Sequence, residues 1–352
     1  MVNVAIRADG SPSMGMGHIM RCLSLAKAFA CAGCKVIFFT KYESGLKVIK
    51  NAGFEANQLY SAGEGTGGLD YGTPEDLKDE LRELIPLMEK NLTDVFIVDS
   101  YNVNEEYFHR LRENVRKLVY IDDVNKFTYP VDVLINGNIT GKYLDYKKYL
   151  EHEVLLNGPE YNLIRDEFQG ISRRVINRDV KEIMVTTGGS DPYNTCLGIA
   201  ESIAAQEEFA GLDINIVVGS GFHNKLELRE LGKLHKNIVL HENVKSMSEV
   251  MLRSDMAISA GGSTVYELCA CGTPALAVIL ADNQEFITRK MDELGYLESL
   301  GWYNSLNTGN WMEKFKKMYG DYEKRSEMSA KMQGLVDGKG AQRAVDAILT
   351  TL

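Results

Sequence analysis

No apolar run in this 352-residue sequence approaches the roughly 20 residues needed to span a bilayer, so we expect no membrane span. The N-terminus enters a predicted strand at once, without the basic and apolar regions of a secretory signal, and a cytoplasmic location is expected. Positive charge is scarce, with 39 Lys and Arg against 49 Asp and Glu and a formal net charge of −10. This balance argues against a nucleic-acid partner held by a general positive field.

Several motifs of nucleotide and metal enzymes are missing. The lack of G-x-x-x-x-G-K-[ST] argues against a kinase or ATPase. No predicted strand leads through G-x-G-x-x-G into a helix with an acidic partner, which argues against a nicotinamide dehydrogenase. No H-x-x-x-H pair is present to hold a metal. The chemistry is therefore expected to run without a metal or another cofactor.

Cysteine is also sparse, and the pattern of the six cysteines does not complete a metal site. Cys31 and Cys34 form a C-x-x-C pair, but no second closely spaced Cys or His pair accompanies it. The pair lies at the end of an apolar helix predicted before Gly33, where free cysteines pack as small hydrophobes. We interpret the pair as structural, with a metal or redox site as the alternative.

The most informative stretch is residues 7–25, RADGSPSMGMGHIMRCLSL, which follows a short apolar strand predicted at residues 2–6. Gly15 and Gly17 open onto a helix predicted to begin at His18. A strand, a glycine loop and a helix N-terminus together form a site for an anionic ligand. Near the positive end of a helix an imidazole favours its neutral form, which can act as a base. We predict that His18 is a catalytic base facing a phosphorylated substrate.

Polar residues follow three successive predicted strands in the first half. They are Asp99, Ser100 and Tyr101 after residues 95–98, Asp122 and Asp123 after residues 118–121, and residues 136–138 after residues 131–135. Ligands of parallel α/β sheets lie beyond the carboxyl ends of the strands, so these residues are site candidates. Tyr101 has the greatest reach. A solvated turn would have the same composition, and this alternative stays open.

The second half repeats the pattern of strand, glycine loop and helix. Gly188 and Gly189 follow a strand predicted at residues 183–187, and residues 261–264, GGST, open a helix at 265–271. Backbone N–H groups at such a loop, with the hydroxyls of Ser263 and Thr264, can bind a diphosphate. Glu267 lies one helical turn further on, where its carboxylate could accept hydrogen bonds from both ribose hydroxyls or merely complement the helix dipole.

Two β-α-β assemblies joined by a polar region predict an α/β protein with two Rossmann-like, doubly wound domains facing across a cleft. We place an N-terminal domain at 1–158, a nucleotide-binding domain at 159–300 and a helical C-terminal tail at 301–352, which we expect to brace the two. The glycine-rich residues 61–74 are interpreted as a surface loop, with a mobile lid as the alternative.

The motif R-A-D-G-S followed by G-x-G-H-x-x-R-C-L-x-L-A resembles the start of the UDP-2,4-diacetamido-2,4,6-trideoxy-β-L-altropyranose hydrolases of pseudaminic acid biosynthesis. Further similar stretches are residues 98–101, 122–123, 161–165, 188–191, 259–267 and 283–284, so that the resemblance covers roughly residues 2–300. Outside the first motif the similarity extends to the glycosyltransferase-B (GT-B) superfamily, which includes the undecaprenyl-linked GlcNAc transferase of cell-wall synthesis. The resemblance implies a GT-B-like fold.

The resemblance also implies an activity: hydrolysis of a UDP-sugar at its anomeric carbon, with inversion, release of UDP and no metal. In this family pattern His18 activates the attacking water, and Tyr101 and Asn283 contact the sugar or the phosphate. Glu267 matches the ribose-binding acid, and residues 241–247 fall where uracil is read by backbone groups. The substrate-binding residues that we predict are Arg7, Asp9, Gly15, Gly17, Gly188, Gly189, Val244, Gly262, Ser263, Thr264, Glu267 and Gln284.

The expected partner is thus a small-molecule UDP-sugar, with other enzymes of the same pathway as candidate protein partners. Two other functions stay open from the sequence. A glycosyltransferase of the same fold would move the sugar to an acceptor instead of to water. A nucleotide-sugar binding protein would lack catalysis, although a histidine at the loop-to-helix junction disfavours this alternative.

Overall fold

The structure of the protein, a computed structural model, describes residues 1–11, 14–60, 73–307 and 310–352. The described chain forms two compact units, each built on its own parallel sheet. Unit 1 consists of Met1–Asp166 and Lys339–Leu352, and unit 2 of Glu167–Gly338. The glycine-rich segment at residues 61–74 lies outside the described residues except for Thr73 and Pro74, where Thr73 caps helix α3 through a capping box with Asp76.

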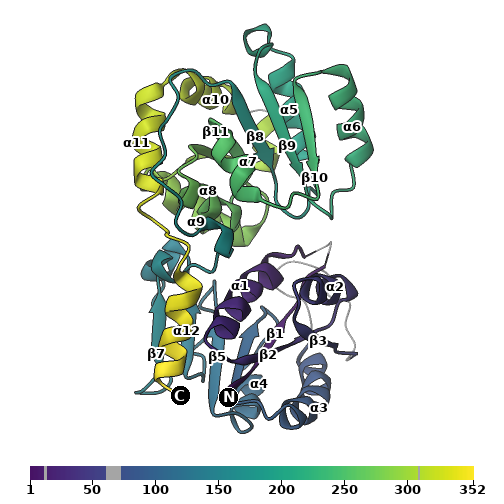
Figure 1. The fold of residues 1–352 in the computed structure, drawn as a ribbon, viewed down its shortest axis with the longest axis vertical. Coiled ribbons are helices and arrows are strands. Elements are labelled where there is room, and N and C mark those ends of the chain that lie inside the picture. The colour runs from purple at the N-terminus through teal and green to yellow at the C-terminus, as the bar shows by residue number, and fades with distance from the viewer. Residues whose placement is uncertain (12–13, 61–72, 308–309) are drawn as a thin grey trace. The chain divides into compact units, whose positions relative to one another are not determined.

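The sheet of unit 1 has seven strands within the described residues, in the order β3-β2-β1-β4-β5-β6-β7, and neighbouring strands are parallel (Figure 1). The strands are β1 (Asn3–Ala8), β2 (Lys35–Thr40), β3 (Glu55–Gln58), β4 (Val95–Asp99), β5 (Lys117–Ile121), β6 (Val133–Asn136) and β7 (Val154–Asn157). The helices are α1 (Gly17–Cys31), α2 (Glu43–Asn51), α3 (Pro74–Lys90), α4 (Glu105–Arg112) and α12 (Gly340–Thr350), with short 3-10 turns η1 (Ile139–Tyr143), η2 (Pro159–Tyr161) and η3 (Asp166–Phe168), the last running into unit 2. The strand order reverses between β1 and β4, which makes their carboxyl ends a topological switch point.

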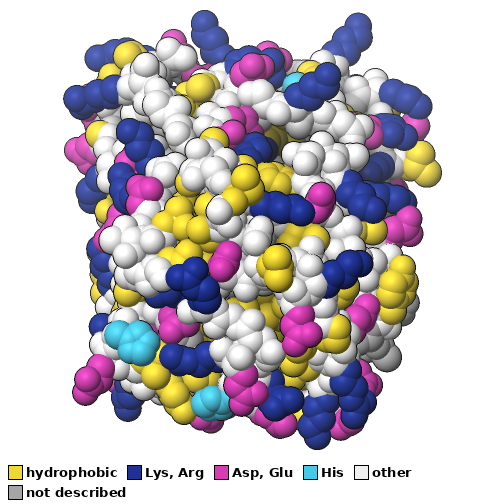
Figure 2. Space-filling model, turned by 60° about the horizontal axis from the view of Figure 1, so that its bottom comes forward, with side chains coloured by type: hydrophobic (Ala, Val, Ile, Leu, Met, Phe, Trp, Pro, Cys, Tyr) yellow, Lys and Arg dark blue, Asp and Glu magenta, His cyan; other side chains and the backbone are white. Residues whose placement is uncertain are grey.

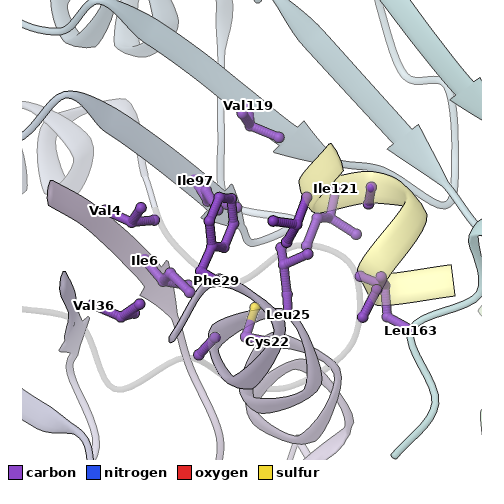
Figure 3. Close-up of a cluster of buried hydrophobic side chains, with 14 of the residues drawn as sticks. Val4, Ile6, Cys22, Leu25, Phe29, Val36, Ile97, Val119, Ile121 and Leu163 are labelled. Carbon is purple, nitrogen blue, oxygen red and sulfur yellow. The ribbon is translucent and has the colours of Figure 1, made fainter. Parts of the chain in front are cut away.

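Alternation of side chains along β1 divides them between two cores, one on each face of the sheet. Val4 and Ile6 pack with Phe29 of α1 in the first core (Figure 3), and Ala5 packs with residues of α3 and α4 in the second. Burying a side chain of the size of Phe29 contributes roughly 1.5–3 kcal/mol to folding. The same alternation places Arg7 on the α3 and α4 face, away from α1.

The C-terminal helix α12 packs against α1 within unit 1 (Figure 1). Ala344, Val345 and Ile348 occur at helical spacing and are buried in the first core. A Cβ at Gly340 would lie 2.2 Å from the carbonyl oxygen of Asn162, so the close approach at the start of α12 requires glycine. The preceding helices α10 and α11 lie in unit 2. The bracing role of this C-terminal segment stays a prediction.

In the described part of unit 2 the sheet has six parallel strands in the order β10-β9-β8-β11-β12-β13. The strands are β8 (Glu182–Thr186), β9 (Asp213–Val218), β10 (Ile238–Glu242), β11 (Met256–Ala260), β12 (Ala275–Ile279) and β13 (Glu298–Trp302). The helices are α5 (Thr195–Ala204), α6 (Lys225–Leu234), α7 (Met247–Arg253), α8 (Thr264–Cys271), α9 (Asp282–Glu293), α10 (Trp311–Gly320) and α11 (Tyr322–Met332), with 3-10 turns η4 (Glu207–Phe209) and η5 (Tyr303–Asn307). The switch point of this sheet lies between β8 and β11.

The structure adds three strands, β3, β7 and β13, to those predicted from the sequence. Each is the outermost strand at an edge of its sheet. Such strands pair on one side only and need little apolar sequence, and β3 reads EANQ. In β13, Gly301 has a φ of +82° and the pairing with β12 is irregular. Backbone pairing therefore defines β3, whereas β7 reads VLLN, a mostly apolar strand of only 4 residues.

Among the described residues, no helix combines the length and the apolar character that crossing a bilayer requires. Figure 2 shows basic and acidic side chains interspersed over one face of the molecule. On that face, therefore, the acidic side chains do not gather in one area.

Candidate functional site

His18 lies on the first turn of α1, beyond the carboxyl end of β1 and next to that of β4. In the loop before it, Gly15 has a φ of +83°, a backbone angle that residues other than glycine rarely adopt. Gly17 begins α1 and is exposed. Asp99 is the last residue of β4, the strand beside β1. The loop thus carries His18 to the switch point, where a ligand of a parallel sheet is expected.

The imidazole of His18 forms a close pair with the carboxylate of Asp99. Nδ1 of His18 lies 2.6 Å from Oδ1 of Asp99, whose side chain is fully buried. Burial alone would raise the pKa of Asp99, but the charges of Arg21 and His18 and their hydrogen bonds hold it well below its usual value. An ionised carboxylate can only accept, so the proton of the pair belongs on Nδ1. In the neutral ring the lone pair is then on Nε2, the nitrogen that faces away from Asp99.

Arg21, three residues after His18 on α1, joins two carboxylates. Its Nε and Nη2 donate to Asp99 at 2.7 and 2.6 Å, and its Nη1 donates to both oxygens of Asp123 at 3.0 and 2.9 Å. Asp123 also accepts from the hydroxyl of Tyr101 at 2.8 Å and from the amide of Asn138 at 2.6 Å. The fork geometry of a guanidinium suits such paired recognition of carboxylates. The ends of β4, β5 and β6 are thereby tied to α1.

Tyr101 packs against His18 as well as bonding to Asp123. The two rings meet edge to face, with centroids 4.9 Å apart and an interplanar angle of 82°. The structure therefore brings together His18 and Tyr101, both of which the sequence predicts as catalytic. Contact of Tyr101 with sugar or phosphate stays a prediction.

Arg7 and Asp9 lie in a separate buried ionic cluster on the α3 and α4 side of unit 1. Arg7 donates to Asp9 at 2.7 Å and to Glu80 of α3 at 2.7 and 3.0 Å. Glu80 also accepts from Lys41 Nζ and from the hydroxyl of Tyr107, at 2.8 and 2.7 Å. Both predicted residues are 2% exposed and order the start of the loop that leads to His18. Their contact with substrate stays a prediction.

This cluster makes folding sensitive to acid. Burial alone would raise the pKa of Glu80, but Arg7 and Lys41 lower it from 4.5 to about 2. A carboxyl whose pKa is lowered in the folded state stabilises that state at pH values above the ordinary pKa. This contribution is lost as the pH falls from about 4.5 towards 2. The shift corresponds to roughly 3 kcal/mol.

We therefore expect Glu80→Gln to lower the free energy of unfolding by roughly 3 kcal/mol at pH 7. The deficit should shrink as the pH falls below 4.5. Urea unfolding at pH 7, 5 and 3.5 measures it, with Glu89→Gln, an exposed residue of α3, as the matched control. A deficit that stays constant from pH 7 to 3.5 would contradict the charge account.

The glycine loops of unit 2 lie at its own switch point. Gly188, with a φ of +85°, and Gly189 follow β8. Gly262 and Ser263 follow β11, and Thr264 begins α8. Gly189 and Ser263 are exposed, and a Cβ at Gly262 would find its nearest neighbour 3.8 Å away, at Gln284 Nε2. The N-terminus of α8 is therefore open to an anionic group.

The other predicted residues of unit 2 surround the same carboxyl edge of the sheet. Asn283 and Gln284 lie in the first turn of α9, directly after β12. The Gln284 side chain accepts from the N–H of Leu280 at 3.0 Å, which orients its amide group. Glu267 is half-buried on the first turn of α8, and Val244 is half-buried in the turn after β10. Their roles toward a nucleotide stay predictions.

In the described part of the chain, no cluster of three or more His, Cys, Asp or Glu side chains has an arrangement that could hold a metal ion. Cys31 is exposed and Cys34 half-buried, and both are free thiols.

The arrangement of sheets is found in known proteins. MurG of Acinetobacter baumannii matches 99% of this chain and 100% of its own, with a TM-score of 0.70 and 14% identity. A UDP-GlcNAc 2-epimerase from Neisseria meningitidis, solved with UDP-GlcNAc bound, matches 99% and 100% with a TM-score of 0.64 and 14% identity. The chain has the GT-B fold. At such identities the likeness extends to the fold alone.

Sequence comparison finds relatives of this chain in addition to the structural matches. Residues 183–343 match the glycosyltransferase family 28 C-terminal domain. The uncharacterized protein MJ1062 of Methanocaldococcus jannaschii is 30% identical over 297 residues, 80% of this chain, which spans only 56% of that relative's length. The spore coat polysaccharide biosynthesis protein SpsG of Bacillus subtilis is 24% identical, over 100% of this chain and 98% of its own. A UDP-2,4-diacetamido-2,4,6-trideoxy-β-L-altropyranose hydrolase of Campylobacter jejuni is 26% identical, over 84% and 98%.

Proposed function

We propose that the chain hydrolyses a UDP-linked 2,4-diacetamido-2,4,6-trideoxy sugar at its anomeric carbon, with inversion, to UDP and the free sugar. The observation that carries the proposal is the pair of His18 and Asp99 at the switch point of unit 1, with Nδ1 of the ring at 2.6 Å from the carboxylate. The distant relationship to the Campylobacter jejuni hydrolase supports the sugar and the use of water. The GT-B fold supports a nucleotide-sugar substrate.

In this mechanism Nε2 of His18 takes a proton from water as the oxygen attacks the anomeric carbon. The bond from that carbon to the β-phosphate oxygen breaks, and its electron pair leaves with UDP. A single displacement inverts the anomeric centre. Asp99, held ionised by Arg21, stabilises the imidazolium that forms.

Unit 2 binds the nucleotide in this proposal. Backbone N–H groups at the start of α8 and the hydroxyls of Ser263 and Thr264 stabilise the charge that develops on the departing diphosphate. UDP is a good leaving group and needs little acid catalysis, so a site in which His18 acts as a base is sufficient for the reaction. The carboxylate of Glu267 accepts hydrogen bonds from the two ribose hydroxyls.

A phosphorus NMR time course with the UDP-diacetamido-trideoxy-altropyranose, in buffer without metal or acceptor, tests the proposed function. We expect the phosphorus signals of the UDP-sugar to be replaced by those of UDP, while free sugar appears in proton spectra of the same sample. An unchanged substrate would overturn the hydrolase assignment for this sugar, and UDP release that starts only when an acceptor is added would establish a transferase.

The ribose contact gives a separate prediction for Glu267→Ala. Each hydrogen bond to a charged group contributes about 1.5–3 kcal/mol, so loss of the carboxylate should weaken UDP binding at least about tenfold. The variant should lose less affinity for 2′-deoxy-UDP, which lacks one of the two hydroxyls. Calorimetric titration measures both, with Glu249→Ala, an exposed residue of α7, as the control. Equal losses for the two nucleotides would contradict the ribose contact.

A further inference from the structure

Arg21 is the charged residue of the G-x-G-H-x-x-R stretch for which the proposed reaction has no step of its own. Its guanidinium lies beside the His18 ring as well as on the two carboxylates, with Nη2 at 3.3 Å from Nδ1 of His18. Because Nδ1 carries the proton that points to Asp99, this is an approach of two N–H groups. A fixed positive charge therefore adjoins the ring that must stay neutral to act as a base.

The charges around His18 oppose each other. Asp99 alone, buried and 2.6 Å from the ring, would favour the imidazolium and so remove the base. Arg21 offsets this attraction, because its two hydrogen bonds to Asp99 neutralise the carboxylate and its charge repels a second proton on the ring. Asp123 reduces the effect of Arg21 in turn, because its carboxylate accepts hydrogen bonds from Nη1 and so partly neutralises the guanidinium.

Within the described residues, two further side chains and a helix terminus lie near the pair of His18 and Asp99. The Tyr101 ring, which follows β4, meets His18 edge-on, and its hydroxyl donates to Asp123. The thiol of Cys22, next to Arg21 on α1, donates to Asp99 at 3.3 Å, and burial raises its pKa well above the ordinary value, so that it stays uncharged. The N-terminus of α1 adds partial positive charge. The charged side chains that set the balance are therefore Asp99, Arg21 and Asp123.

We propose that Arg21 is a positioning residue that tunes His18: it holds Asp99 in place and lowers the proton affinity of the ring, while Asp123 limits that effect. The consequence for catalysis rests on the proposed hydrolysis, but the electrostatic part does not. Because Arg21 and Asp123 carry opposite charges, the proposal predicts the direction of the effect of removing each one. Removing Arg21 and removing Asp123 should shift the protonation of His18 in opposite directions.

The test is a nitrogen NMR pH titration of the histidine rings in the full chain, with the His18 signal assigned by its loss in His18→Gln. Arg21→Gln should raise the midpoint of the His18 titration by about one pH unit, as expected for loss of a nearby charge in a partly shielded site. Arg21→Lys, which keeps the charge but not the fork, should shift the midpoint less. Asp123→Asn should lower the midpoint.

An unchanged midpoint in folded Arg21→Gln, or a shift of the same sign in Arg21→Gln and Asp123→Asn, would overturn the proposal. If Arg21→Gln does not fold, Arg21→Lys and Asp123→Asn decide together: midpoints that do not move in opposite directions overturn the proposal. In the rate profile of a folded, active Arg21→Gln, the acid limb of kcat/KM should move to higher pH, with activity largely recovered in alkali. If the His18 midpoint shifts as expected but no UDP-sugar is hydrolysed, the electrostatic inference stands and the proposed function fails.

Discussion

Replacing His18 with glutamine should lower kcat by about 100- to 10,000-fold, the range that a general base contributes, and leave the Kd for UDP within twofold. Glutamine nearly keeps the volume and polarity of the side chain but cannot accept a proton from water. In the proposal UDP binds to unit 2, whereas His18 is on α1 of unit 1, so nucleotide affinity should not depend on the ring. Initial rates from phosphorus NMR and calorimetric titration with UDP measure the two effects.

His109→Gln is the matched control for this substitution. His109 is a histidine on α4 of the same unit with a side chain 44% exposed, paired with Glu105 on its own helix. It should keep full activity. Loss of UDP binding together with activity in His18→Gln would contradict the assignment of His18 as the base, and so would retention of more than about a tenth of the activity.

The second large effect is expected for Asp99→Asn, which should lower kcat by at least about 100-fold. An asparagine can turn its amide N–H toward Nδ1, which would then accept, and the proton of the neutral ring would move to Nε2. The nitrogen that must take a proton from water would already carry one. The side chain also loses its charge, so the imidazolium formed during the reaction is no longer stabilised.

Asp99 is fully buried and bonded to Arg21, so the substitution is checked for folding by thermal unfolding and by UDP affinity. Asp166→Asn, which breaks the exposed pair of Asp166 with Lys27, is the control and should be silent. A folded Asp99→Asn with nearly full kcat would show that the pair with His18 plays no part in the reaction.

The sequence predicts the central elements well because buried parallel strands and amphipathic helices leave clear apolar patterns. The strand predicted at residues 95–98 forms as Val95–Asp99, and the helix predicted at residues 265–271 forms as Thr264–Cys271. The GT-B fold, expected from the resemblance, is confirmed by the two parallel sheets and by the likeness to MurG. The edge strand β3, which reads EANQ, was not predicted because it is defined by backbone pairing and has no apolar run.

The site is predictable from the sequence where its residues are neighbours in the chain or directly follow a predicted strand. Gly15, Gly17 and His18 follow one another in the chain, so one motif identifies the loop. Asp99 and Asp123 are recognisable as polar residues at strand ends, but their common bond to Arg21 spans 78 and 102 positions. Two signals could have found Arg21: its helical spacing from His18 and its place in the G-x-G-H-x-x-R stretch. Arg7 pairs with Glu80, 73 positions away, because its side chain lies on the face of β1 that α3 covers. The sequence does not show which helix covers that face, so this pair could not be predicted.

The central claim is that water attacks the anomeric carbon and not the phosphate. The measurement that tests it most directly is hydrolysis of the UDP-sugar in water enriched in oxygen-18, with the released UDP examined by phosphorus NMR for an isotope shift. The proposed mechanism breaks the bond between carbon and oxygen, so UDP should contain no oxygen-18. Oxygen-18 in the β-phosphate of UDP would mean attack at phosphorus and would contradict the account.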